Sequence, residues 1–204
     1  MPAPARSIFE HLRKPLSFLL AVIWLKLAVV SEPGRYDQGW HLVMEYAGYL
    51  CLIVAALGRL WSYAQIGGRK NLHLCREGPY SITRNPLYLF SFVGVVGAGL
   101  ALQNMPLLLV TAGGFLVYYH FVIRAEERRL RALFGAAFVS YCAEVPRFWP
   151  RHLRVRQPDT ITLPTKLFNR NLAEIFWFLA LIVGIEVIDQ GKEARWWPTT
   201  PLWF

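Results

Sequence analysis

Long apolar segments separated by short polar ones organise this chain of 204 residues. Five of them come close to the roughly 20 residues that a helix needs to cross a bilayer, although some are a little short. They are Leu16–Val30, His41–Leu60, Leu87–Leu102, Pro106–Ile123 and Leu172–Ile188. Only a few residues separate the third segment from the fourth, which predicts a tight helical hairpin. The pattern therefore predicts an all-α, polytopic membrane protein with about five transmembrane helices.

A different pattern follows the fourth segment. The stretch EERRLRALFGAAFVSY, Glu126–Tyr141, has apolar residues at helical spacing on one face and charged residues on the other. Those apolar residues are Leu130, Leu133, Phe134, Ala137, Phe138 and Tyr141. We expect an amphipathic helix on the inner side of the membrane, ended by VPRFWP. The chain then divides into two membrane helices (1–60), a core (61–150) and a C-terminal extension with the fifth helix (151–204).

The distribution of charge supports a membrane topology. The chain has 22 Lys and Arg residues against 13 Asp and Glu, a net charge of +9, and its mean hydropathy is +0.32. Most basic residues lie before the first apolar segment, between the second and third, or between the fourth and fifth. The positive-inside rule then predicts a cytoplasmic amino terminus and accounts for the charge without nucleic acid. The three cysteines show no metal-ligand spacing, and we expect no metal site.

The candidate site lies where GPYSITRNPLYLF, Gly78–Phe90, enters the third apolar segment. Two prolines make this turn rigid, and a helix entrance offers free N–H groups to an anion. Glu126, where the fourth segment leaves the membrane, would attract a cationic or amino group. A site that offers both positive and negative charge suits a zwitterionic ligand on the inner side of the membrane. By composition alone, Arg84 and Arg124 fit equally well as interfacial anchors.

Two blocks resemble the integral-membrane methyltransferases related to isoprenylcysteine carboxyl methyltransferase and phospholipid N-methyltransferases. GPYSITRNPLY is similar to their G-x-Y…R-H-P-x-Y motif, and AEERRLRALFGAAFVSYCAEVPRFWP is similar to their second signature. The resemblance covers roughly residues 60–150. The first two apolar segments match in topology, and the chain after Arg151 is an addition.

The resemblance implies S-adenosylmethionine bound at the cytoplasmic ends of the helices, and a lipid or prenylated acceptor that reaches it from the bilayer. It leaves a homo-oligomer open. The implied catalytic residues are Arg84, Asn85, Arg124 and Arg147. The implied cofactor-binding residues are Gln65, Leu72, His73, Leu74, Cys75, Tyr80, Asn85, Pro86, Leu87, Tyr88 and Glu126.

Two positions differ from the family pattern. Asn85 stands where the family usually has histidine, and Phe90 where a glycine often follows the motif tyrosine. An amide forms hydrogen bonds but does not titrate, so Asn85 is not a proton shuttle. Two other functions stay open: an NADPH-dependent membrane reductase of the sterol-reductase type, and a non-catalytic membrane sensor or scaffold. The acceptor stays open between a prenylcysteine, a phospholipid amine, and an isoprenoid or fatty acid.

Overall fold

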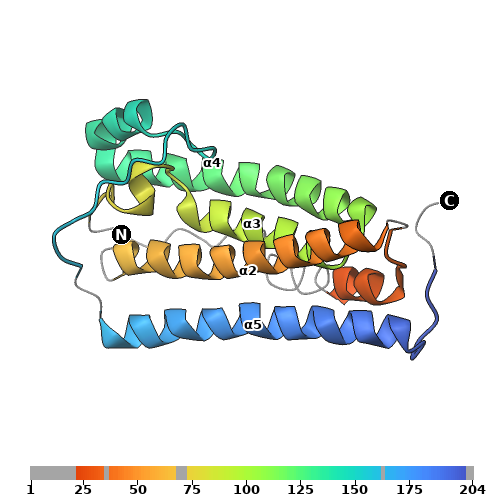
Figure 1. Cartoon of the computed structure of the whole chain (residues 1–204). Helices are drawn as coiled ribbons and strands as arrows, with labels where there is room; N and C mark the ends of the chain where they lie inside the picture. Colours follow the sequence, from red (N-terminus) through yellow and green to blue (C-terminus); the bar gives the residue numbers. More distant parts are fainter. Residues whose placement is uncertain (1–21, 35–36, 68–72, 162–163, 201–204) are drawn as a thin grey trace, which may run out of the picture.

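The computed structural model describes residues 22–34, 37–67, 73–161 and 164–200. Its regular elements are α2 (Gln38–Ile66), the short 3₁₀ helix η1 (Pro79–Ser81), α3 (Pro86–Ala101), α4 (Met105–Glu144) and α5 (Thr165–Glu193). Residues 22–30 are also helical. The four long helices run side by side along one direction, with α5 next to α2 and α4 on the far side of α3 (Figure 1).

Three helices in the described part of the chain are long and apolar enough to cross a membrane: Gln38–Ile66, Met105–Glu144 and Phe168–Glu193. Their surfaces carry exposed apolar side chains such as Val110 and Trp177, which suit contact with lipid. The predicted polytopic, all-α class is confirmed. The third predicted span is a helix of only 16 residues. Of the first predicted span, residues 22–30 are helical, and residues 16–21 lie outside the described residues.

Small residues bring α2 and α3 into close contact. A Cβ added to Gly48 would lie 2.4 Å from the backbone nitrogen of Ala101, so the two backbones nearly touch there. Such close approach is typical of helices packed within a membrane. Further along the same interface, a Cβ on Gly58 would lie 2.1 Å from the ring of Phe90. The phenylalanine that departs from the family pattern therefore fills the space over a glycine of α2.

The prediction of a separate amphipathic helix at Glu126–Tyr141 was wrong in its boundaries. α4 continues unbroken from Met105 into this segment, because no proline or glycine interrupts it between residues 115 and 134 and good helix formers fill its polar part. The helix kinks at Gly135, whose φ of 51° is a conformation that glycine adopts readily. The kink also changes the predicted apolar face: Phe138 is buried, whereas Leu133 is exposed.

Residues 151–161 connect α4 to α5 across η1 (Figure 1). The Gly78 N–H donates to the Arg156 carbonyl oxygen at 2.7 Å, and the Arg156 N–H donates to Ser81 Oγ at 3.0 Å. After this crossing, α5 packs along α2 and also contacts α3. The extension therefore forms part of the same helical bundle, while the division of the chain at residues 60 and 150 stays a prediction.

Candidate functional site

A cavity of about 570 Å³ lies at the end of the bundle where α2 ends and where α3 and α5 begin. Its volume falls within the range of small-molecule sites, roughly 300–1,000 Å³. Side chains from α2, the loop before η1, the start of α3, the middle of α4 and the start of α5 surround it. The lining residues are Arg59, Tyr63, Ile66, Gly67, His73, Leu74, Cys75, Tyr80, Arg84, Asn85, Pro86, Leu87, Tyr88, Tyr119, Glu126, Leu130, Phe134, Tyr141, Arg170 and Asn171.

Most of the predicted site residues meet at this cavity. Those that line it are His73, Leu74, Cys75, Tyr80, Arg84, Asn85, Pro86, Leu87, Tyr88 and Glu126. Leu72 lies outside the described residues. Gln65 is buried behind the loop, and the close approach of its amide explains the glycine at Gly78: a Cβ there would lie 2.5 Å from Gln65 Nε2. Arg124 is exposed, and neither it nor Arg147 lines the cavity.

Tyr88 and Glu126 form a wall with negative charge and aromatic faces. The Tyr88 hydroxyl donates to Glu126 Oε2 at 2.9 Å, which links the start of α3 to α4. The Tyr119 ring lies 4.8 Å from the Tyr88 ring, centroid to centroid, and stacks on Phe115 at 4.1 Å. A carboxylate beside aromatic rings is an environment that attracts a cationic ligand.

Tyr80 forms the buried floor of the loop. It belongs to η1, and its carbonyl oxygen accepts a hydrogen bond from the Tyr141 hydroxyl at 2.6 Å. Burial raises the pKa of the Tyr80 phenol well above its ordinary value, because the phenolate would lose its hydration. Tyr80 is therefore a neutral hydrogen-bonding group at physiological pH.

Arg84 lines the cavity and is held in a polar network. Its Nε and Nη2 donate to Glu127 Oε1 at 3.1 and 2.8 Å, and its Nη1 donates to the carbonyl oxygens of Cys142 and Val145 at 3.0 and 2.8 Å. Glu127 also forms an ion pair with Arg147 at 2.7 Å. The geometry thus gives this motif arginine a structural role, because it joins the start of α3 to the end of α4.

The neighbouring motif residues hold the same segment. Asn85 Nδ2 donates to the Arg147 carbonyl oxygen at 2.8 Å, and the Arg84 N–H donates to the Pro146 carbonyl oxygen at 2.9 Å. Thr83 Oγ1 also reaches the Arg147 carbonyl, at 3.3 Å. The Asn85 side chain forms no N-cap hydrogen bond to α3, since its amide bonds to residues 145–148, the VPRF segment, instead.

Sequence reasoning missed two sets of lining residues. Tyr119, Leu130, Phe134 and Tyr141 come from α4, while Arg59, Tyr63, Arg170 and Asn171 come from α2 and α5. Arg59 carried a usable signal, because an ionisable side chain within an apolar segment is costly unless it has a role. It pairs with Glu174 of α5 at 2.6 Å. Asn171 carried no such signal, because only the packing of α5 brings it to the cavity.

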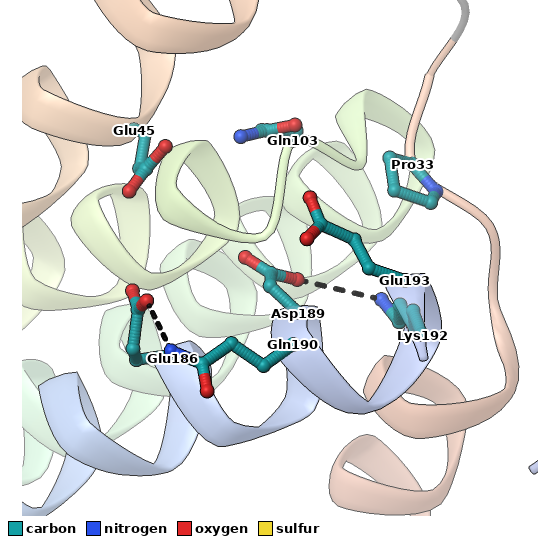
Figure 2. Close-up of a pocket in the computed structure, with 8 residues that line it drawn as sticks. All are labelled: Pro33, Glu45, Gln103, Glu186, Asp189, Gln190, Lys192 and Glu193. Atoms are coloured by element: carbon teal, nitrogen blue, oxygen red, sulfur yellow. Dashed lines mark hydrogen bonds and ion pairs between the residues drawn. The ribbon is translucent and has the colours of Figure 1, made fainter. Parts of the chain in front are cut away.

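A second cavity, of about 150 Å³, lies at the opposite end of the bundle (Figure 2). Figure 2 shows acidic and amide side chains around it, with Lys192 paired to Asp189 at 3.9 Å and Gln190 bonded to Glu186 at 2.9 Å. None of the predicted site residues lies there. Within the described ranges, no group of three or more His, Cys, Asp or Glu side chains is placed to hold a metal ion.

Comparison with known proteins identifies relatives along most of the chain. A family model described as phospholipid methyltransferase matches residues 43–137. The nickel-cobalt-cadmium resistance protein NccN of Alcaligenes xylosoxydans xylosoxydans is 34% identical over 199 residues, which cover 97% of this chain and 92% of NccN. The chain belongs to the phospholipid methyltransferase family. The cobalt-zinc-cadmium resistance protein CzcN of Cupriavidus metallidurans is 37% identical over 176 residues, covering 86% of this chain and 81% of CzcN.

The family match contains much of the large cavity. It includes most of α2, η1, the start of α3 and Glu126 on α4. Arg170 and Asn171, which also line the cavity, lie beyond the matched region. No significant match was found among solved structures.

Proposed function

We propose that this chain transfers a methyl group from S-adenosylmethionine to a lipid or lipid-attached acceptor. The observation that carries the proposal is the large cavity, where the GPYSITRNPLY turn and Glu126 meet at the ends of apolar helices. Membership in the phospholipid methyltransferase family supports it.

The lining residues fit this cofactor. Glu126, with Tyr88 and Tyr119 beside it, would hold the positively charged part of the ligand. Tyr80 and residues 73–75 would enclose the remainder. The volume of about 570 Å³ leaves room for a small polar molecule with an acceptor group next to it.

S-adenosylmethionine supplies an electrophilic methyl group: a lone pair of the acceptor forms the new bond to carbon, while the S–C bond breaks and leaves its electron pair on the sulfur of S-adenosylhomocysteine. The chain contributes position and exclusion of water. Asn85 does not titrate, and its amide is occupied with the Arg147 carbonyl oxygen. An acceptor oxygen that is already ionised, such as a carboxylate, needs no base and suits this arrangement better than an amine that must lose a proton.

We infer the side of the membrane on which the site lies from the distribution of charge. Basic residues concentrate around this end of the bundle, so the positive-inside rule favours a cytoplasmic site with a cytoplasmic amino terminus. Two relatives are named for resistance to nickel, cobalt, zinc and cadmium. Under our proposal, a contribution of this chain to such resistance would operate through the methylated membrane component.

Binding of S-adenosylhomocysteine to the purified protein, measured by calorimetry in lipid nanodiscs, tests the site. Glu126→Gln should weaken binding of S-adenosylhomocysteine about tenfold or more. The substitution removes the negative charge that would pair with the amino group of the ligand, and losing such a partly buried pair costs on the order of 1.4 kcal/mol or more. Glu45→Gln, at the opposite end of the bundle, is the matched control and should bind as the parent does. If the Glu126→Gln variant bound S-adenosylhomocysteine as tightly as the parent does, Glu126 would not be a binding residue.

The reaction itself is tested by mass spectrometry of a total lipid extract after incubation with methyl-labelled S-adenosylmethionine. We expect label in a membrane lipid or lipid-attached product. Binding of NADPH in place of S-adenosylhomocysteine would favour the reductase. Binding of S-adenosylhomocysteine without any labelled product would favour the non-catalytic alternative and contradict our proposal.

A further inference from the structure

The large cavity has a second polar wall that the cofactor does not require. Arg59 and Tyr63 of α2 and Arg170 and Asn171 of α5 form it, opposite in charge to the wall with Glu126. α5 lies outside the region that the family model matches. Arg59 and Tyr63 lie within the matched region, so only the α5 part of this wall, with Arg170 and Asn171, is additional to that region.

Asn171 is the most informative of these residues. Its residue exposure is 3%, and none of the described residues donates a hydrogen bond to its Oδ1. A buried polar atom almost always has a partner, and one that borders a cavity without a partner is available to a ligand donor. Asn171 thus calls for a ligand with an N–H or O–H group at this position.

The charges beside Asn171 specify a second property of the ligand. Arg170 is the residue before Asn171 on α5 and is exposed at the cavity, and Arg59 lines the same cavity from α2. Glu174 pairs with Arg59 at 2.6 Å, so the two arginines and one carboxylate leave an excess of positive charge. Arg59 Nε is also buried and has no hydrogen-bond partner in the described part of the chain. This wall attracts an anionic group.

We propose that Arg170 and Asn171 form the subsite for the acceptor's head group, and that this head group carries an anion with a hydrogen-bond donor next to it. The inference rests on the proposed function, because it identifies the second ligand of the same cavity. Arg170 would bind the anion at the rim, and the Asn171 carbonyl would accept from the donor deeper in. Both residues would set acceptor specificity and leave the cofactor wall unchanged.

Three single-chain amphiphiles separate the two recognition elements. N-oleoylglycine has a carboxylate and an amide N–H, N-oleoylsarcosine keeps the carboxylate without the N–H, and N-oleoylethanolamine keeps the N–H without the charge. Binding is measured by native mass spectrometry and by thermal shift of the full chain in detergent. We expect N-oleoylglycine to bind at least about tenfold more tightly than either of the others.

Two variants assign each preference to a residue. Asn171→Leu should abolish the preference for N-oleoylglycine over N-oleoylsarcosine, and Arg170→Gln should abolish its preference over N-oleoylethanolamine. The matched controls are Asn169→Leu and Lys166→Gln, exposed on the same helix. S-adenosylhomocysteine affinity, measured on every variant, should stay within about threefold of the parent because the Glu126 wall is intact.

These measurements separate the two proposals. If S-adenosylhomocysteine binds but the three amphiphiles bind equally, or if Asn171→Leu and Arg170→Gln leave every preference unchanged, the subsite is refuted and the proposed function stands. If S-adenosylhomocysteine does not bind to the parent, the proposed function fails. Competition by inorganic phosphate at the same concentration as N-oleoylglycine would identify a soluble anion as the ligand and would overturn the lipid assignment.

Discussion

Replacing Arg84 with glutamine should loosen the attachment of the VPRF segment, residues 145–148, to the start of α3, while the hydrogen bonds from the Arg84 N–H, Asn85 and Thr83 remain. The side chains of Arg84 and Glu127 are only 10% and 12% exposed, so solvent screens their interaction weakly. The substitution removes two hydrogen bonds to the carbonyl oxygens of Cys142 and Val145, in addition to the ion pair. Glu127 keeps its pair with Arg147, which limits the loss.

The magnitude follows from these contacts. Hydrogen bonds from a charged donor contribute about 1.5 kcal/mol or more each, so the two carbonyl bonds alone account for about 3 kcal/mol. A local opening free energy lower by about 3 kcal/mol corresponds to roughly 100-fold faster amide exchange. The effect should concentrate in residues 138–148, which include the Val145 N–H that donates to the Tyr141 carbonyl oxygen at 3.0 Å.

Hydrogen exchange with mass spectrometry, on protein in nanodiscs, measures this opening directly. Arg84→Lys should recover only a minor part of the protection, because one ammonium does not reach a carboxylate and two carbonyls as a guanidinium does. Arg128→Gln, exposed on α4, is the control. If the glutamine variant kept its protection against amide exchange in residues 138–148 but lost methyl transfer, the structural role would be refuted and a catalytic role of Arg84 would be favoured.

Two further substitutions test the packing. Gly48→Ala should lower the melting temperature, because the added methyl would overlap the α3 backbone and overpacking costs about 1–3 kcal/mol. Its control, Gly113→Ala, has open space around it and should leave the melting temperature unchanged. Equal melting temperatures of the two variants would contradict the close contact between α2 and α3. Tyr141→Phe leaves the Tyr80 carbonyl oxygen without its donor and should destabilise the protein by about 1–3 kcal/mol. Tyr46→Phe, at an exposed position, is its control, and comparable thermal unfolding of both variants would count against the buried bond.

Local patterns were enough to locate the elements and much of the proposed site. Hydropathy predicted α2, α3, the first part of α4 and α5, since a helix in lipid must present apolar side chains along its length. The rigid turn at Gly78–Phe90 and the glutamate at Glu126 predicted where polar groups would gather, because both interrupt apolar surroundings. Both features are encoded within a few neighbouring residues.

Tertiary structure decided which partners these residues have. Arg84 lies 43 positions before Glu127 in the chain, and only the packing of α3 against α4 brings them together. Asn171 gave no signal, because an asparagine near a helix start looks like an ordinary interfacial residue until α5 is placed beside α2. Sequence alone determined the approximate position and the polarity of the apolar helices. The contacts between helices depend on how their surfaces fit together, and a one-dimensional pattern does not contain that fit.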